Sequence, residues 1–280
     1  MKPFSRRDFL KSAGASAFAL PAFARSGLNT ASAPQPLGLQ LYTVRDWMQK
    51  DMEYTLKTVY SIGYREVEFA GLFDKKADKV KNWLDKIGLT SPSSHVSYER
   101  LKANLQAVVD EAQTLGNTYV VCPDVDSRLR LDADAWKRVA ADFNRFGEQL
   151  QRVGLRFAYH NHEFEWKPLP GGEIGYDILV NETDPRYVKL QMDLYWIAKA
   201  GKDPLSYFAK FPGRFPMVHV KDMAGNGAMV DVGKGVIDWG RIFAKRREAG
   251  IEHFYVEHDE PKAPFDDIKI SYDYLVRLGL

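Results

Sequence analysis

The sequence is poor in cysteine, in net charge and in long apolar runs. Cys122 is its single cysteine, which excludes an intramolecular disulfide. Its 39 Lys and Arg residues nearly balance its 37 Asp and Glu residues, and a formal charge of +2 gives no electrostatic reason to expect nucleic acid or an anionic membrane as partner. Beyond the N-terminal segment, no stretch approaches the roughly 20 apolar residues that span a bilayer. These absences argue against a nucleic-acid-binding protein and against stable membrane insertion.

The first 24 residues have the layout of an export signal. Residues 5–11 read Ser-Arg-Arg-Asp-Phe-Leu-Lys, and the weakly apolar run from Ser12 to Ala24 ends in Ala-Phe-Ala. A basic segment, a short apolar segment and a small-x-small ending predict a cleavable signal, and the adjacent arginines make it a twin-arginine signal. We expect cleavage after Ala24, with the site after Ala33 as the alternative, and a flexible lead-in over residues 25–36.

This signal predicts a bacterial protein that the twin-arginine machinery exports, already folded, to the periplasm. The signal segment carries four basic residues and one acidic residue, so the mature chain is close to neutral. The apolar run is too short, and too rich in Ala, Gly and Ser, for a membrane anchor.

After the lead-in, short apolar runs of β type alternate with amphipathic helical stretches. Glycines at 63, 88, 116, 154 and 250 come shortly before strands, where a helix C-cap favours glycine. The clearest predicted helices cover residues 101–115, 134–153, 239–249 and 268–278. The predicted strands cover residues 37–42, 66–69, 91–96, 118–122, 155–160, 188–193, 217–220 and 254–257.

Eight strands that alternate with helices predict an α/β fold of parallel β-α units. At this chain length the natural closure is a (β/α)8 barrel, so we expect a single TIM-barrel domain over residues 37–280. The alternative is a doubly wound open sheet, which would carry Gly-x-Gly-x-x-Gly after its first strand. Residues 41–45 read Leu-Tyr-Thr-Val-Arg and offer no such motif.

Polar residues gather at the C-terminal ends of the predicted strands, where barrel enzymes place their active sites. Five of the six histidines follow this placement, and only His253 does not. On the fifth strand, His160 and His162 share a face with the small Ala158, so both are expected to point into the barrel mouth. The other strand-end candidates are Glu68, His95, Asp193, His219, Lys221, Asp222 and Glu257.

Imidazoles and carboxylates that converge from different strands make a mixed site for a divalent cation. Asp193, His219 and Glu257 form the strongest set, and together they predict one bound Mn, Co, Zn or Mg ion. All four metals accept nitrogen and oxygen ligands, so the sequence does not select between them.

Short motifs follow one another in a specific order along the chain. They occupy residues 38–45, 63–68, 94–95, 159–165 (Tyr-His-Asn-His-Glu-Phe-Glu), 192–193, 219–222 (His-Val-Lys-Asp), 232–239 and 256–257. In these motifs the chain resembles the sugar phosphate isomerase/epimerase superfamily, the xylose-isomerase-like barrels, from about Leu37 to Leu280.

The resemblance implies a metal held by an acidic residue from strand five together with Asp193, His219 and Glu257. Strand five departs from the family, because His-Asn-His stands where many members carry Glu-x-His. The strand-five ligand is therefore either Glu163 or His160, and Glu163 is the preferred one.

The resemblance also implies proton abstraction next to a carbonyl, assisted by the metal. Sugar epimerases of the family use two metal-bound glutamates, of which Glu257 alone is secure here. An imidazole opposite Glu257, from His160 or His162, resembles instead the keto-inositol dehydratases and keto-glycoside lyases, which expel a β-oxygen. Lys221 is expected to hold the developing oxyanion. The predicted catalytic residues are Glu257, His162 and Lys221, and the predicted substrate contacts are Glu68, His95, Trp196 and Asp222.

We therefore expect a metal-dependent isomerase, epimerase or lyase that acts on an unphosphorylated sugar or keto-sugar. The alternative from a different class is a periplasmic carbohydrate-binding barrel without catalytic activity. An AP endonuclease is disfavoured, because residues 193–196 read Asp-Leu-Tyr-Trp and lack the Asp-x-x-His of that branch. The choice of sugar and the oligomeric state, a homo-oligomer included, are left open.

Overall fold

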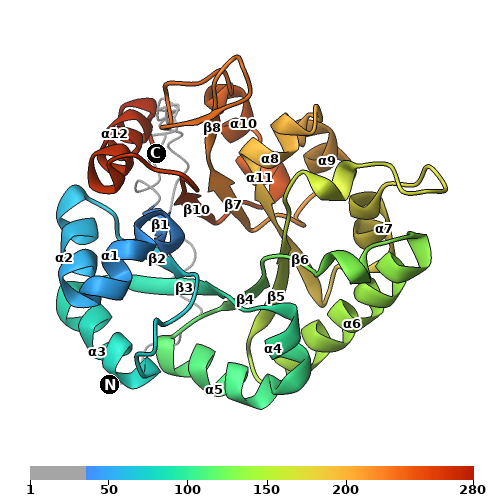
Figure 1. Cartoon of the computed structure of the whole chain (residues 1–280), viewed down its shortest axis with the longest axis horizontal. Helices are drawn as coiled ribbons and strands as arrows, with labels where there is room; N and C mark the ends of the chain where they lie inside the picture. The colour runs from blue at the N-terminus through green and yellow to red at the C-terminus, as the bar shows by residue number, and fades with distance from the viewer. Residues whose placement is uncertain (1–35) are drawn as a thin grey trace, which may run out of the picture. The chain divides into compact units, whose positions relative to one another are not determined.

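The computed structural model describes residues 36–280, which form a closed barrel of parallel strands ringed by helices (Figure 1). Around the barrel the strands follow the order β1-β10-β7-β6-β5-β4-β3-β2, and each neighbouring pair is parallel. The predicted (β/α)8 barrel is therefore confirmed. The barrel strands are β1 (Leu37–Gln40), β2 (Glu66–Phe69), β3 (Thr90–His95), β4 (Tyr119–Cys122), β5 (Arg156–His160), β6 (Val188–Asp193), β7 (Met217–Val220) and β10 (His253–Val256).

The predicted twin-arginine signal, both cleavage sites and all of the lead-in except Pro36 lie outside the described residues. They stay predictions. Within residues 36–280, no helix has the length and apolar character needed to cross a membrane.

The observed strands agree with the predicted ones to within two residues at either end. The largest difference is in β1, which was expected to continue to Tyr42 and ends at Gln40. The Gln40 side chain accepts a hydrogen bond from the backbone N–H of Tyr42 at 3.1 Å, which caps the 3-10 helix η2 (Leu41–Val44). The chain therefore turns out of the sheet at this point.

Two of the helices predicted from the amphipathic pattern are each divided into two helices in the structure. The predicted helix over residues 101–115 is divided, because Asn104 has an extended φ of −157° and its side chain caps the following helix at Ala107. The predicted helix over residues 239–249 is likewise divided into two short helices. The helices are α1 (Arg45–Lys50), α2 (Met52–Ile62), α3 (Ala77–Ile87), α4 (Tyr98–Ala103), α5 (Leu105–Leu115), α6 (Ala133–Arg152), α7 (Gly175–Glu182), α8 (Leu194–Lys199), α9 (Pro204–Lys210), α10 (Trp239–Phe243), α11 (Arg246–Ala249) and α12 (Pro264–Leu278), with η3 (Ser127–Leu129) and η4 (Phe164–Trp166) as further 3-10 turns.

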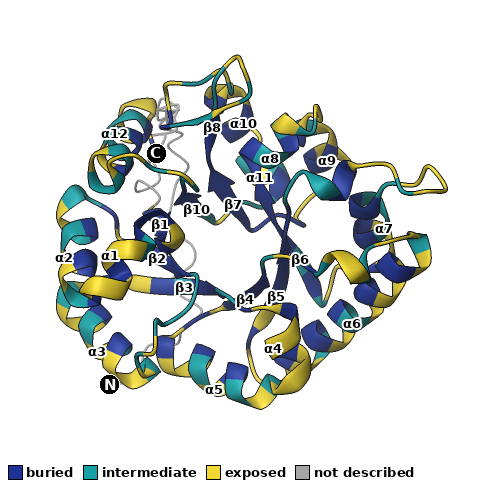
Figure 2. Cartoon of the chain, in the orientation of Figure 1, coloured by how far each residue is buried: buried dark blue, intermediate teal, exposed yellow. Residues whose placement is uncertain are grey.

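The core has two layers, and side-chain alternation on the strands separates them. The larger layer lies between the strands and the surrounding helices, whose outer faces are exposed (Figure 2). The smaller layer fills the barrel interior and includes Ala158, as the alternation on the fifth strand predicted. The interior is tight at Gly38, where an added Cβ would lie 2.5 Å from the Tyr255 ring. The interior residues are Tyr119, Val121, Ala158, Met217 and Tyr255.

Candidate active site

A cavity of about 350 Å³ opens at the C-terminal ends of the barrel strands. Its wall includes six of the predicted site residues: His95, His160, His162, Trp196, Lys221 and Glu257. Asp193 and His219 are fully buried and contact this wall through Lys221 and Glu257. Side chains from β3, β5, β6, β7 and the segment after β10 are thus brought together, as the strand-end rule predicted.

His219 is held between two carboxylates. Its Nδ1 lies 2.6 Å from Oε2 of Glu257, and its Nε2 lies 2.6 Å from Oε2 of Glu68. Burial opposes a charge on this ring, but the two carboxylates outweigh it and raise the pKa of His219 to about 10. The contact with Glu68 fixes the ring so that Nδ1 faces Asp193 and Glu257.

Glu68 does not make the substrate contact that was predicted for it. Its side chain is completely buried, and its carboxylate accepts hydrogen bonds from Gln40 (2.8 Å), Ser93 (2.6 Å) and Gln191 (2.8 Å) besides the contact with His219. Burial alone would raise its pKa, but His95 and His219 hold the pKa of Glu68 well below its usual range. Because it lies beneath the imidazoles and both of its oxygens are occupied, Glu68 orients His219 and does not reach the cavity.

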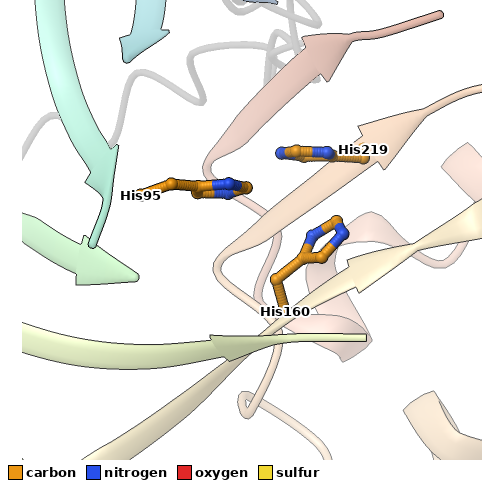
Figure 3. Close-up of side chains that lie close together, drawn as sticks. All are labelled: His95, His160 and His219. Atoms are coloured by element: carbon orange, nitrogen blue, oxygen red, sulfur yellow. The ribbon is translucent and has the colours of Figure 1, made fainter. Parts of the chain in front are cut away.

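The imidazoles of His95, His160 and His219 lie close together (Figure 3), and those of His95 and His219 also contact the carboxylate of Glu68. His95 stacks on His219 with ring centroids 5.3 Å apart, and the His160 ring lies 4.5 Å from the His219 ring. The amide of Gln191 donates to Glu68, so its Oε1 accepts from Nε2 of His95 (2.8 Å) and from Nδ1 of His160 (3.1 Å). This network assigns the proton of His160 to Nδ1 and leaves its Nε2 lone pair free.

The free nitrogen of His160 faces the predicted metal ligands. Nε2 of His160 lies 3.8 Å from Oδ2 of Asp193. Burial, together with the neighbouring His219, holds the pKa of His160 well below its ordinary value, so the ring is neutral and able to act as a ligand.

Lys221 places a positive charge among three carboxylates. Its Nζ lies 2.9 Å from Asp193, 2.7 Å from Glu257 and 2.9 Å from Asp259. Burial disfavours the ammonium form, but these carboxylates outweigh burial and hold the pKa of Lys221 well above its ordinary value. Burial itself would raise the pKa of Glu257, yet Lys221 and His219 hold it far below the usual range. The same burial, with the charge of Glu257, raises the pKa of Asp259 to about 6.

The donor set fits a divalent metal ion. Asp193, His219 and Glu257 each offer one buried ligand atom, and these atoms lie within 4.8 Å of one another. Oδ1 of Asp193 caps α8 through the N–H groups of Tyr195 and Trp196, both at 3.0 Å. Its Oδ2 pairs with Nζ of Lys221 at 2.9 Å and has no hydrogen bond from another group among residues 36–280. One oxygen of Asp193 therefore serves the fold, and the other is available for a cation.

Glu163 lies outside this cluster, which corrects the preference for it as strand-five ligand. Its carboxylate pairs with Nζ of Lys167 at 2.9 Å, and its side chain is 30% exposed. The turn after β5 directs Glu163 outward, whereas His160, the last residue of β5, still faces the barrel interior. Of the two alternatives, the structure places only His160 beside Asp193 and His219.

His162 provides a base in the cavity wall that makes no side-chain hydrogen bond through Nδ1 among residues 36–280. Its Nδ1 is buried and has no hydrogen-bond partner within the described chain. The ring stacks on Phe164 with centroids 5.6 Å apart and lies 5.7 Å from the Trp196 ring. Burial and the charge of Lys221 lower the pKa of His162 to about 3, so the imidazole is neutral.

Asp222 differs from its prediction as a substrate contact. It is fully buried and is not among the residues that line the cavity. Its carboxylate accepts hydrogen bonds from five donors: the N–H groups of Met223, Gly233, Gly235 and Ile237, and the indole of Trp239. Asp222 thus anchors the loop after the β8–β9 hairpin (Asp222–Met223 and Met229–Val230) beside Lys221.

The sequence analysis assigned no role to three residues that shape the site: Gln191, Glu165 and Asp259. Gln191 stands two residues before Asp193 on the same face of β6, so strand alternation could have identified it. Asp259 follows Glu257 by two residues and lines the cavity. Glu165 holds His162 in place, because it accepts the backbone N–H of His162 at 2.9 Å and the hydroxyl of Tyr159 at 2.7 Å. No local pattern indicated that Glu165 turns inward.

Replacing Glu165 with glutamine is expected to change how stability depends on pH. Burial raises the pKa of Glu165 to about 7, from an ordinary value of 4.5. The folded protein therefore holds this proton more tightly than the unfolded chain, and the resulting stabilisation, complete below pH 4.5, is lost as the pH rises through about 7. Between about pH 5 and about pH 8, urea unfolding should show wild type losing up to ~3 kcal/mol relative to Glu165→Gln, which cannot ionise.

The matched control is Glu163→Gln, two residues away and partly exposed. Its effect on the unfolding free energy should differ by less than about 0.5 kcal/mol between the two pH values, because the Lys167 pair is a surface ion pair. Any constant loss from the missing acceptor in Glu165→Gln cancels when the two pH values are compared. Equal pH dependence in the two variants would contradict the buried, proton-holding state of Glu165.

Comparisons with known proteins place the chain among sugar-acting barrels of the same fold. Residues 56–277 match the family described as Xylose isomerase-like TIM barrel. An inosose dehydratase of Lacticaseibacillus casei is 26% identical to the chain, over 76% of this chain and 85% of that protein. A sugar phosphate isomerase/epimerase from Parabacteroides distasonis ATCC 8503 superposes with a TM-score of 0.77 at 26% identity, over 90% of this chain and 97% of that one. At 15% identity, the IolI protein with a bound zinc atom shares the fold, with a TM-score of 0.70 over 87% of this chain and 97% of that one. The family match spans most of the described barrel, and the chain belongs to the xylose isomerase-like TIM barrels.

Proposed function

We propose that this protein is a metal-dependent dehydratase or lyase that acts on an unphosphorylated keto-sugar. The observation that carries the proposal is the asymmetry of the cavity wall: the imidazole of His162, whose Nδ1 has no partner among the described residues, and the carboxylate of Glu257, whose Oε2 contacts both His219 and Lys221. The inosose dehydratase relatives support the same class of reaction, because inosose is a cyclic keto-polyol.

The metal would be held by Asp193, His219 and Glu257, with Nε2 of His160 as a fourth donor. When bound, a divalent ion of the Mn, Co, Zn or Mg type supplies Lewis acidity that polarises the substrate carbonyl. Lys221 lines the cavity with its ammonium group and would stabilise negative charge that develops on the substrate oxygens.

The reaction needs one base and returns its proton. The neutral ring of His162 takes the proton from the carbon next to the ketone. The electron pair left on that carbon forms a carbon–carbon double bond as the bond to the β-oxygen breaks. The proton on His162 then passes to the departing oxygen. The products are an unsaturated ketone and either water or an alcohol, and the reaction is redox-neutral.

The side chains of the cavity wall favour elimination over epimerisation. An epimerase needs a second group on the opposite face that can exchange a proton with the same carbon. Oε2 of Glu257 lies 2.7 Å from Nζ of Lys221 and 2.6 Å from Nδ1 of His219, and Glu257 is one of the three proposed metal ligands, so this oxygen is not free to act as that second group. A base on one face of the substrate returns its proton more readily to a leaving oxygen than to the opposite face of the carbon.

Location in the periplasm is a separate proposal that rests on residues 5–11. Sugar phosphates are mostly cytosolic, which is why we propose an unphosphorylated substrate. Fractionation of cells that express the full chain tests the export proposal, with Arg6→Lys/Arg7→Lys as the variant expected to stay in the cytoplasm.

Metal content tests the predicted ligand set. Wild type should carry about one divalent metal per chain by mass spectrometry, and Asp193→Ala/His219→Ala should carry almost none. The matched control is Glu66→Ala/His253→Ala, which removes a Glu–His pair of the barrel strands that lies outside the cavity, with Oε2 and Nδ1 2.8 Å apart. The control should retain its metal.

Two results together would refute the metal site. They are wild type without bound metal, and a melting temperature that does not rise when Mn, Co, Zn or Mg is added. Turnover is tested separately by α-proton exchange of inosose in deuterated water. The alternative, a carbohydrate-binding barrel without chemistry, predicts sugar binding with no exchange.

A further inference from the structure

A second cavity, of about 610 Å³, adjoins the candidate active site. The two cavities share Trp196 and Asp259 as wall residues. The walls of the second cavity come from α8, the β8–β9 hairpin and the segment between β10 and α12. None of the proposed steps uses this space.

Contacts between these three elements hold the second cavity in shape. The hydroxyl of Tyr195 in α8 donates to the backbone oxygen of Gly227 in the hairpin at 3.0 Å. The backbone N–H of Asp259 approaches Sδ of Met229 at 3.1 Å, which ties the hairpin to the segment after β10. The space is therefore bounded by segments that are linked to one another.

The walls suit a neutral polyhydroxy ring. Tyr195 and Trp196 pack edge to face with centroids 4.8 Å apart, and Met229 and Val230 add apolar surface. Lysines at 199, 234 and 262 stand among carboxylates at 231, 259, 260 and 267, so neither sign of charge dominates. Hydroxyl groups both donate and accept hydrogen bonds, and an uncharged polyol can use donors and acceptors of both kinds.

Trp196 links this space to the reacting site. The Trp196 ring lies 5.7 Å from the His162 ring, measured between centroids. Nζ of Lys199 lies 5.0 Å from the centroid of the Trp196 ring. The indole Nε1 is buried without a hydrogen-bond partner in residues 36–280. A ligand that spans both cavities would pass beside Trp196 and Asp259.

We infer that the second cavity is a leaving-group subsite, and that the substrate is a keto-glycoside of two units whose second unit lies between α8 and the β8–β9 hairpin. This inference rests on the proposed elimination. When the ketone is two carbons from the anomeric carbon, the carbon between them loses the proton, and the glycosidic oxygen is the β-oxygen. The bond from the anomeric carbon to that oxygen breaks, a carbon–carbon double bond forms, and the oxygen leaves with the second unit as an alcohol after it receives the proton from His162. No oxidant or reductant is needed.

Equilibrium binding of parent sugars to the full chain tests the subsite without turnover. Isothermal titration calorimetry is run with glucose and with a panel of cellobiose, maltose and trehalose. At least one disaccharide should bind wild type about tenfold or more tightly than glucose. Ala228→Trp places a large side chain in the second cavity and should remove this preference.

The matched control is Gly225→Trp on the same hairpin, where an added Cβ meets nothing within 4 Å. It should keep the preference for the disaccharide. Lys199→Ala, outside the hairpin, is a second variant and should reduce the preference about threefold or more, even if Ala228→Trp fails to fold.

Two outcomes would overturn the subsite: no disaccharide binds wild type more tightly than glucose, or the preference survives both Ala228→Trp and Lys199→Ala. Inosose, with one ring, reports on the proposed function alone. Exchange of inosose without a disaccharide preference removes the subsite and keeps the enzyme. A disaccharide preference without exchange keeps the subsite as a sugar-binding site and removes the elimination.

Discussion

Replacing His162 with glutamine is expected to slow α-proton exchange of inosose by about 10²- to 10⁴-fold, the range that a general base contributes. The reason is that His162 is the base in the cavity wall whose Nδ1 has no partner in the described structure, and that burial keeps it unprotonated, with a pKa of about 3. Exchange is followed by proton NMR in deuterated water. The dissociation constant of glucose should change less than about threefold, because glutamine retains a polar side chain of similar reach.

The matched control for this prediction is His253→Gln. His253 opens β10, lies outside the cavity and pairs with Glu66, so its loss should leave the exchange rate within about twofold of wild type. A His162→Gln protein that exchanges at the wild-type rate would remove His162 as the base. A raised KM with unchanged kcat would instead assign His162 to substrate binding.

Replacing Glu68 with glutamine is expected to lower the free energy of unfolding by at least ~3 kcal/mol. The carboxylate is fully buried and receives donors from Gln40, Ser93, Gln191 and His219. Glutamine removes the negative charge and points an amide donor at other donors, which leaves the buried His219 with one carboxylate fewer. Urea unfolding at neutral pH measures the change.

Glu66→Gln is the control, since Glu66 lies on the same strand and the same strand face as Glu68. Within residues 36–280 its carboxylate has a single side-chain partner, Nδ1 of His253 at 2.8 Å, so the expected loss is about 1 kcal/mol. Equal losses in the two variants would show that the network around Glu68 contributes nothing beyond one ordinary hydrogen bond. A larger loss at Glu68 also explains why this residue serves the site from below.

The local sequence pattern was sufficient to predict the strands and several site residues. The alternation Ala158, His160, His162 predicted which side chains of β5 face inward, and the barrel interior contains Ala158 as expected. The strand-end rule brought Asp193, His219 and Glu257 to one cluster, because parallel strands in a closed barrel all end at the same rim.

Depth within the barrel was not visible in the sequence. Glu68 was predicted to touch substrate because it lies near a strand end. Pairing across the closed sheet sets it opposite Gln40 on one side and Ser93 on the other, and Gln191 reaches it from across the interior. These partners are separated by up to 123 positions in the chain, so only barrel closure and strand register could show that the carboxylate is enclosed.

Asp222 and Glu163 were misplaced for a related reason. Each follows a strand by a few residues, where backbone turns decide the direction of a side chain and no periodic pattern continues. The five donors around Asp222 come from residues 223–239, which converge only when the loop folds back over β7. Glu163 turns outward to Lys167, while Glu165 turns inward to Tyr159.

The sequence alone therefore determined the fold class, the strands and the kinds of side chain at the barrel rim, because periodicity and strand-end placement are local properties of the chain. Tertiary structure alone decided which of those side chains meet: His160 rather than Glu163 beside Asp193, Glu68 beneath His219, and Asp259 shared between two cavities. Closure of the sheet, strand register and loop conformation depend on contacts between distant segments, and those contacts set burial, charge and proton positions in the site.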